Sequence, residues 1–153
     1  MLSFFKKKAV NFFSPEEKEK ILSAIKATEQ TTSGEVRVFV ENHCSFVDAV
    51  DRAAEIFYKL KMQQTVHNNA TLVYVALKDK QLAVFGDEGI YNKTGKAFWH
   101  NAVNHMLQDF DKQNYADGIA DVVKEIGAAL TLHFPNEAST DKNELPDDIV
   151  FGK

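Results

Sequence analysis

The chain is poor in cysteine, proline and glycine, and it contains no long hydrophobic run. Its 153 residues include a single cysteine, Cys44, which cannot form an intramolecular disulfide, so nothing in the sequence requires an oxidising compartment. No segment approaches the ~20 consecutive apolar residues of a membrane-spanning helix. Lysines interrupt the N-terminal phenylalanines, so the apolar stretch of a secretory signal is missing as well. We therefore expect a cytoplasmic protein with no integral membrane segment.

The charge balance excludes one class of partner. The formal net charge is -4, and proteins that bind nucleic acid rely on many basic residues to neutralise phosphates. We expect no nucleic-acid partner. With 44% hydrophobic and 26% charged residues, the composition is typical of a soluble globular chain that is long enough for one domain.

The first helix has a clear start signal. Ser14 is a good N-cap, Pro15 suits the first helical position, and Glu17 can complete a capping box. Ile21 and Ile25 follow at helical spacing. We expect the helix to end before Gly34, where a strand begins.

Alternating and helical periods then predict the rest of the domain. Strands are expected over 36–40, 70–77 and 81–85, and helices over 46–62, 91–110 and from 114 or 117 to 134. The first two strands flank a helix and should be parallel, whereas the third returns through a tight turn and should be antiparallel. The predicted fold is a three-layer α/β/α sandwich with a small mixed sheet.

Three regions follow from this pattern. Residues 1–13 form an aromatic and basic arm, residues 14–135 form the α/β/α domain, and residues 136–153 form an acidic, extended tail. We expect Leu145, Ile149 and Phe151 of the tail to touch the domain. The arm either packs its phenylalanines on the domain or contacts a membrane surface or a protein partner.

Three polar runs, over residues 32–35, 67–69 and 86–89, border the predicted strands. Because parallel strands start at one edge and an antiparallel strand ends there, the runs should meet at one edge of the sheet. Carboxylate and amide oxygens are ligands for hard cations, so this edge predicts a divalent cation site, for Ca²⁺ or Mg²⁺. The candidate ligands are Glu35, Asn69, Asp87 and Glu88. Residues 86–89 can also be read as a simple polar turn.

Glu35 shares one strand face with Arg37, and a charge buried on that face needs a partner. One interpretation is a structural ion pair with a helix. The other is a functional pair, in which Arg37 binds an anion and Glu35 holds a metal ion or water. At the opposite edge, Glu41 and the hairpin turn resemble solvated loop.

Nucleophilic and nucleotide chemistry have weak support. His67 alone among the histidines lies on the predicted site edge, and Ser33 has no Gly-x-Ser-x-Gly context. Neither a P-loop nor a dinucleotide-binding fingerprint is present. We therefore assign no catalytic residue.

The polar runs and their neighbours resemble the TPM domain family. The residues that carry the resemblance are Asn11-Phe12-Phe13, Thr32-Ser33-Gly34-Glu35-Val36-Arg37-Val38, Arg52-Ala53, Phe57, Met62, Asn69, Gly86-Asp87-Glu88-Gly89-Ile90, Phe98-Trp99, His133-Phe134-Pro135 and Asn143-Glu144-Leu145-Pro146.

The resemblance implies an α/β/α sandwich and a short soluble bacterial branch of the family. Some members are described as acid phosphatases or divalent-cation binders, and others as accessory proteins of membrane complexes. We accordingly expect cation binding at the sheet edge, with weak phosphatase activity on a phosphate-containing small molecule. The alternative is a non-catalytic interaction module that binds a protein through residues 1–13.

Overall fold

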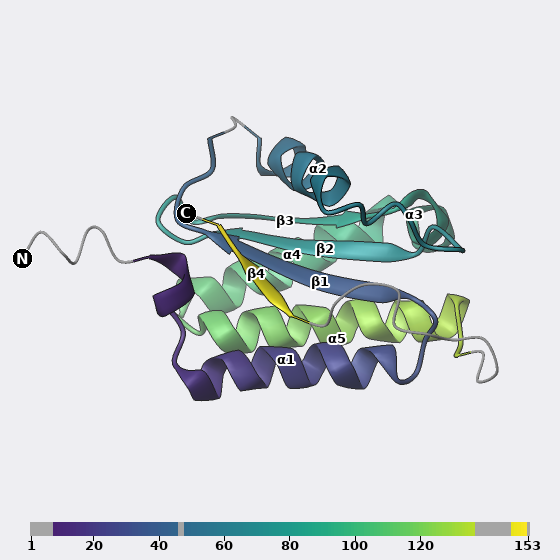
Figure 1. The fold of residues 1–153 in the computed structure, drawn as a ribbon, viewed down its shortest axis with the longest axis horizontal. Helices are drawn as coiled ribbons and strands as arrows, with labels where there is room; N and C mark the ends of the chain where they lie inside the picture. Colours follow the sequence, from purple (N-terminus) through teal and green to yellow (C-terminus); the bar gives the residue numbers. More distant parts are fainter. Residues whose placement is uncertain (1–7, 46–47, 137–147, 153) are drawn as a thin grey trace, which may run out of the picture.

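The computed structural model describes residues 8–45, 48–136 and 148–152. Within these ranges the chain forms a short 3-10 helix, five α-helices and four strands (Figure 1). In chain order they are η2 (Ala9–Asn11), α1 (Pro15–Glu29), β1 (Glu35–Glu41), α2 (Ala49–Lys59), β2 (Ala70–Ala76), β3 (Gln81–Gly86), α3 (Glu88–Thr94), α4 (Lys96–Asp111), α5 (Tyr115–His133) and β4 (Ile149–Phe151).

The start of α1 is the one that the sequence predicts. The backbone N–H of Glu17 donates to Ser14 Oγ at 3.1 Å, and the backbone N–H of Ser14 donates to Glu17 Oε1 at 2.9 Å. This reciprocal capping box satisfies two N–H groups that a helix start would otherwise leave open. Ile21 and Ile25 are fully buried, as their spacing predicts.

The four strands form one mixed sheet in the order β3-β2-β1-β4. β1 and β2 are parallel, with Glu35 opposite Ala70. β3 is antiparallel to β2, with Thr71 opposite Gly86. The predicted parallel unit and antiparallel hairpin are therefore both confirmed.

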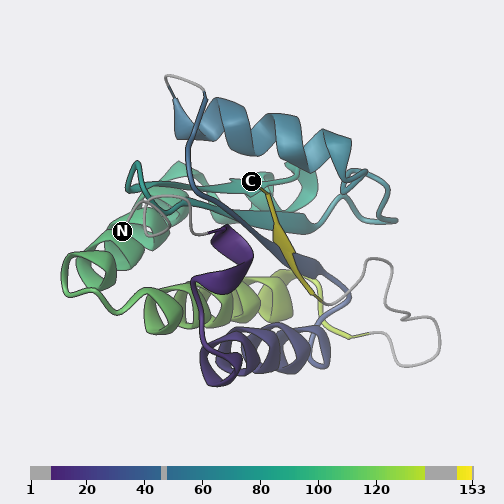
Figure 2. The same ribbon diagram turned by 60° about the vertical axis from the view of Figure 1, so that its left-hand side comes forward.

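Helices cover both faces of the sheet, which confirms the predicted three-layer sandwich. α2 lies on one face, and α1, α4 and α5 lie on the other (Figures 1 and 2). Side chains alternate between the two faces along β1. Val36, Val38 and Val40 join the core that contains α1 and α5 residues, whereas Phe39 joins the core that contains α2 residues. Since both faces are covered, every residue of β1 and β2 is buried.

The prediction of a single helix over 91–110 is wrong. Two helices, α3 and α4, occupy this region, and Gly95 lies between them with a φ of 80°. Glycine adopts this left-handed φ without a steric penalty, so the chain can turn there. α3 also begins earlier than expected, because Asp87 accepts a hydrogen bond from the backbone N–H of Glu88 and caps the helix.

The helix predicted over 46–62 is shorter, and its buried stripe agrees with the expected helical spacing only in part. Phe57 is fully buried, as its helical spacing predicts, and Ile56 beside it is buried as well. Val50 lies seven residues before Phe57, at the same helical spacing, but it is 49% exposed. Phe46 and Val47 lie outside the described residues.

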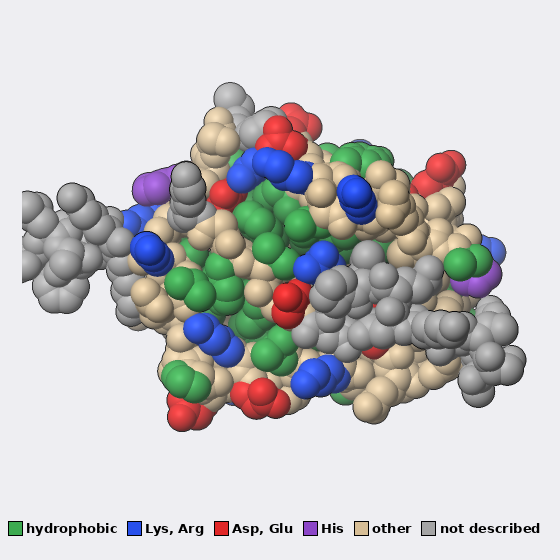
Figure 3. Space-filling view, in the orientation of Figure 1, with side chains coloured by type: hydrophobic (Ala, Val, Ile, Leu, Met, Phe, Trp, Pro, Cys, Tyr) green, Lys and Arg blue, Asp and Glu red, His purple; other side chains and the backbone are tan. Residues whose placement is uncertain are grey.

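The end of the chain extends the sheet. The sequence places Ile149 and Phe151 in an extended tail, whereas the structure places them in β4, parallel to β1. Leu145 lies outside the described residues. Hydrophobic side chains gather on the surface over β4 and β1 (Figure 3), where β4 is half-buried.

The described part of the N-terminal arm packs on the domain. Ala9 and Phe13 are buried, and the rings of Phe12 and Phe13 meet edge-to-face with centroids 5.0 Å apart. Packing of the arm is therefore confirmed for these residues. Residues 1–7 lie outside the described part.

Candidate functional site at the sheet edge

Glu35, Ala70 and Asp87 form one row across three strands. Glu35 is opposite Ala70 in the parallel pair, and the N–H of Asp87 donates to the carbonyl of Ala70 at 2.9 Å. Residues in one row point to the same face of a sheet, so both carboxylates belong to the α2 side. Neighbouring strands lie about 4.8 Å apart, which separates the two outer Cα atoms by about 10 Å. Only the methyl group of Ala70 lies in the row between them.

Both acidic residues of this row are removed from solvent. Glu35 is 2% exposed and Asp87 is 9% exposed. Asp87 Oδ1 accepts a hydrogen bond from the backbone N–H of Glu88 at 2.8 Å, whereas Oδ2 is buried and has no hydrogen-bond partner among the described residues. Burial raises the pKa of the Asp87 carboxyl above its ordinary value. An acceptor in this state is one that a cation or a bound water can satisfy.

Asn69 lies at the same edge and is fully buried. Its backbone N–H donates to Thr65 Oγ1 at 3.2 Å, and its Nδ2 donates to Ser33 Oγ at 3.3 Å. Its Oδ1 is a second buried acceptor for which the described residues supply no hydrogen bond. Alternation along β2 directs Asn69 away from the face that carries Ala70, so Asn69 borders the row at its end.

A glycine brings the loop before β2 against the start of α3. A Cβ atom at Gly89 would lie 2.3 Å from the carbonyl oxygen of His67 and 2.5 Å from that of Asn68. No larger residue fits this approach without moving the backbone. Asn68 itself has a φ of 51°, a conformation that asparagine tolerates better than most residues. The glycine of the third polar run thus positions the second run.

The first polar run is held by the end of α5. The N–H of Ser33 donates to the carbonyl of Phe134 at 3.0 Å, and the N–H of Gly34 donates to Thr32 Oγ1 at 3.0 Å. His67 is exposed, and its ring lies 6.1 Å from that of Phe134. Ser33 and His67 thus both contact Phe134 at the end of α5, and these contacts are structural.

Two other predicted site residues lie apart from the row. Glu88 is exposed in the first turn of α3. Arg37, two positions from Glu35 on the same strand face, donates through Nη2 to Asp148 Oδ1 at 3.0 Å. Its side chain is 8% exposed, and the described residues offer no hydrogen bond to its Nε. The guanidinium therefore keeps one buried donor available beside the row.

The donor set at this edge suits a hard cation. The described residues contain no group of three or more His, Cys, Asp and Glu side chains that could share a metal ion. Zinc in proteins prefers nitrogen and sulfur ligands, and the exposed His67 is the one such side chain in the three polar runs. Two carboxylates with amide and carbonyl oxygens are instead the ligands of Ca²⁺ and Mg²⁺, whose shells water can complete. The oxygen ligands at this edge therefore fit a hard cation.

The opposite end of the sheet differs from the predicted solvated loop. Glu41 is 5% exposed, and it accepts hydrogen bonds from Arg52 Nε and Nη2, both at 2.9 Å, and from the Tyr74 hydroxyl at 2.5 Å. Burial and the neighbouring Glu41 carboxylate raise the pKa of Tyr74. This network corrects the predicted solvated loop, and the signal for it in the sequence is a glutamate that continues the alternation of β1. Its acceptor oxygens are engaged, so it is a structural cluster.

Comparisons with known proteins agree with the fold and identify the family. The family model of the TPM domain matches residues 7–129. A search of curated proteins gave no match. Among solved structures, the NMR structure of the BA42 protein from the psychrophilic bacterium Bizionia argentinensis is 37% identical, with a TM-score of 0.84 over 93% of this chain and 97% of that one.

Two more distant structures share the fold alone. The N-terminal domain of a P. gingivalis protein is 15% identical, with a TM-score of 0.68 over 83% of each chain. That of the cg2496 protein from Corynebacterium glutamicum is 17% identical, with a TM-score of 0.59 over 78% of this chain and 74% of that one. Across the described residues, no helix combines the length and apolar character needed to cross a bilayer. From the match over residues 7–129, the chain belongs to the TPM domain family.

Proposed function

We propose that this TPM domain binds a divalent cation, Ca²⁺ or Mg²⁺, at the sheet edge. One observation carries the proposal: Asp87 Oδ2 and Asn69 Oδ1 are buried acceptors with no hydrogen-bond partner among the described residues, at the same edge. A buried acceptor left unsatisfied costs about 1–3 kcal/mol, so a cation at Asp87 whose bound water extends past the end of the row to Asn69 would relieve both costs.

The proposed ligands are Asp87, Glu35 and Asn69, with Glu88 reaching the ion directly or through water. Two or three carboxylates correspond to modest Ca²⁺ affinity, on the order of 10⁻⁵–10⁻³ M. Backbone carbonyls and water would supply the remaining oxygens. Such a site would exchange its ion readily at ordinary cation concentrations.

We also propose weak phosphatase activity on a small phosphate monoester at this edge. A bound cation there would polarise a phosphoryl oxygen and activate water. Arg37 supports this idea, because its buried guanidinium lies two positions along the strand from Glu35 and retains a donor for a phosphate oxygen. Its role would be to bind and orient the phosphate.

A cation titration tests the first proposal. Backbone amide shifts are followed by NMR while CaCl₂ or MgCl₂ is added. We expect saturable shifts at Gly34, Asn69 and Asp87, with Asp87→Asn weakening the affinity about tenfold or more. Asp121→Asn, the same charge change at an exposed position of α5, should leave the affinity unchanged. If these amides do not move at millimolar cation, the proposal is wrong.

An aryl phosphate assay tests the second. Hydrolysis of p-nitrophenyl phosphate should appear with Mg²⁺ or Ca²⁺ and disappear with chelator. Arg37→Lys should raise KM, because lysine cannot reproduce the planar fork of donors. Cation binding without turnover would remove the phosphatase proposal and leave the cation site standing.

The alternative function is a non-catalytic interaction module that uses the N-terminal arm. Val10 and Phe12 are 38% and 36% exposed, although they lie next to buried residues. Affinity capture with wild type and with Val10→Ser and Phe12→Ser together tests it. These substitutions leave the buried Ala9 and Phe13 in place. A partner that binds both proteins equally would argue against the arm.

A further inference from the structure

Strand β3 has one side with no neighbouring strand in the described sheet, because it is the last strand in the order. The N–H of Asp87 donates to Ala70, so these two residues form a hydrogen-bonded pair. In an antiparallel ladder such pairs recur at every second residue. The residues between them, Leu82 and Val84, therefore direct their N–H and C=O groups away from β2, towards the free edge.

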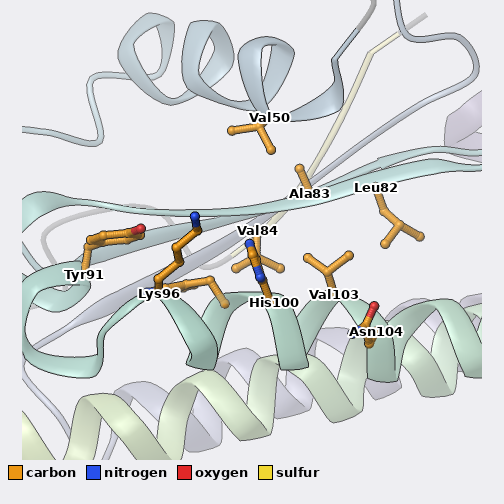
Figure 4. A pocket seen from close by; sticks show the side chains of 10 residues that line it. Val50, Leu82, Ala83, Val84, Tyr91, Lys96, His100, Val103 and Asn104 are labelled. Carbon is orange, nitrogen blue, oxygen red and sulfur yellow. The ribbon is translucent and has the colours of Figure 1, made fainter.

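A cavity of about 390 Å³ lies along this unpaired side of β3. Leu82 and Val84 of β3 contribute to its lining, with Val50 from α2 on one side and Val103 from α4 on the other (Figure 4). Val50 is 49% exposed although it is apolar. The groove thus combines apolar walls with unpaired backbone groups, the two features that a strand-like ligand uses.

The polar side chains of the groove are cationic or neutral. Lys96 and His100 point from α4 towards the strand (Figure 4), and Asn104 lies one turn beyond His100. No carboxylate is among the described lining residues. The groove is therefore complementary to a ligand that carries an acidic group on the α4 side.

We propose that this groove binds an extended peptide of a partner protein, which adds to the sheet as a fifth strand beside β3. Its backbone would pair with Leu82 and Val84. Its side chains would alternate between the α2 side, where Val50 offers an apolar contact, and the α4 side, where a glutamate or aspartate would meet Lys96. This binding is independent of the cation site.

The observations favour such a peptide over a second copy of the chain. β3 reads Gln81-Leu82-Ala83-Val84-Phe85-Gly86 and contains no acidic residue. Two copies paired through this edge would leave Lys96 and His100 of each groove without a carboxylate from the opposing strand. A peptide with an acidic residue supplies the missing charge.

A random octapeptide library is the first probe. It is selected against the wild-type protein alone. We expect the retained peptides to alternate apolar residues with others and to contain an acid. They should bind Lys96→Glu about tenfold more weakly than wild type, whereas Lys93→Glu, on exposed α3 surface, should bind normally.

Hydrogen exchange then distinguishes strand addition from side-chain contact. A selected peptide should slow exchange at the amides of Leu82 and Val84, which face the free edge without it. The same peptide with alternate backbone nitrogens methylated should lose both binding and protection. The proposal is overturned by a library that enriches nothing, by bound peptides that leave both amides unprotected, or by protection that rises with protein concentration alone, which would show self-association.

Discussion

Glu35 and Asp87 occupy the two ends of one row across the sheet, with Ala70 between them, although they come from the first and third strands along the chain. Both side chains are buried on the same side of the sheet. Their proximity depends entirely on β3 running antiparallel to β2. If β3 ran parallel to β2, Asp87, which directly follows β3, would lie at the opposite end of the sheet from Glu35. The two carboxylates would then share no edge.

The methyl group of Ala70 sets how closely the two carboxylates can share an ion. Ala70→Val would place two more carbons in the row, and we expect Ca²⁺ affinity to fall about tenfold with a stability cost of about 1–3 kcal/mol. Calorimetric Ca²⁺ titration measures the affinity, and urea unfolding measures the cost. Ala76→Val is the matched control, since it is buried on the same face at the other end of β2. Equal affinities for the two variants would contradict the shared site.

Gly89 fixes the distance between the loop before β2 and α3. In Gly89→Ala the new Cβ would meet the carbonyl oxygen of His67 at 2.3 Å, so we expect a loss of about 1–3 kcal/mol in unfolding free energy and shifted amides at Asn68 and Asn69. Asn92→Ala, on the exposed surface of α3, should cost less than about 0.5 kcal/mol. Urea unfolding and NMR test both. A fully stable Gly89→Ala protein would mean that the loop moves freely.

The sequence was sufficient to predict which polar runs meet at the sheet edge, because the helix starts, turns and strand directions there depend on local sequence signals. Ser14 and Pro15 begin a helix through their own chemistry, and the short turn before Gln81 forces β3 to return beside β2. Alternation then assigns faces without any knowledge of distant residues. The meeting of three polar runs follows from strand direction alone.

The features that the sequence did not predict depend on contacts with residues far away in the chain. Gly95 interrupts a region whose apolar spacing runs on through Phe98, so the period alone did not reveal the break. The burial of Glu41 depends on Arg52 from α2. The three residues of β4 are too few for a period, and they form a strand because β1 offers them an open edge.

The network around Glu41 should matter for stability. Glu41→Gln removes a charge that Arg52 contacts with two nitrogens, and breaking a buried ion pair leaves the other charge uncompensated. We expect the unfolding free energy to fall by about 3 kcal/mol. Glu55 also pairs with Arg52 but is 47% exposed, so Glu55→Gln should cost less than about 1 kcal/mol. Similar losses from the two variants in urea unfolding would refute the distinction.

His105 on α4 and Glu125 on α5 give stability a pH dependence. His105 Nδ1 lies 3.0 Å from Glu125 Oε2, and the hydrogen bond and charge of Glu125 raise the pKa of His105 above its ordinary 6.5. Asp109 adds a smaller contribution in the same direction. The protonated histidine is therefore favoured in the folded state. NMR titration of the ring should show the raised pKa in wild type, a clear decrease in Glu125→Gln, and a smaller one in Asp109→Asn.

The direction of the stability effect follows from proton linkage. A histidine with a raised folded pKa contributes stability that is fully present below its unfolded pKa and is lost as the pH rises through the folded pKa. Wild type should therefore exceed Glu125→Gln in unfolding free energy at about pH 5.5, and the difference should shrink by about pH 8.5. Both residues are partly exposed, so added salt should reduce the difference as well. A difference that grew with pH would show that Glu125 stabilises the helix pair by some route other than the charged histidine.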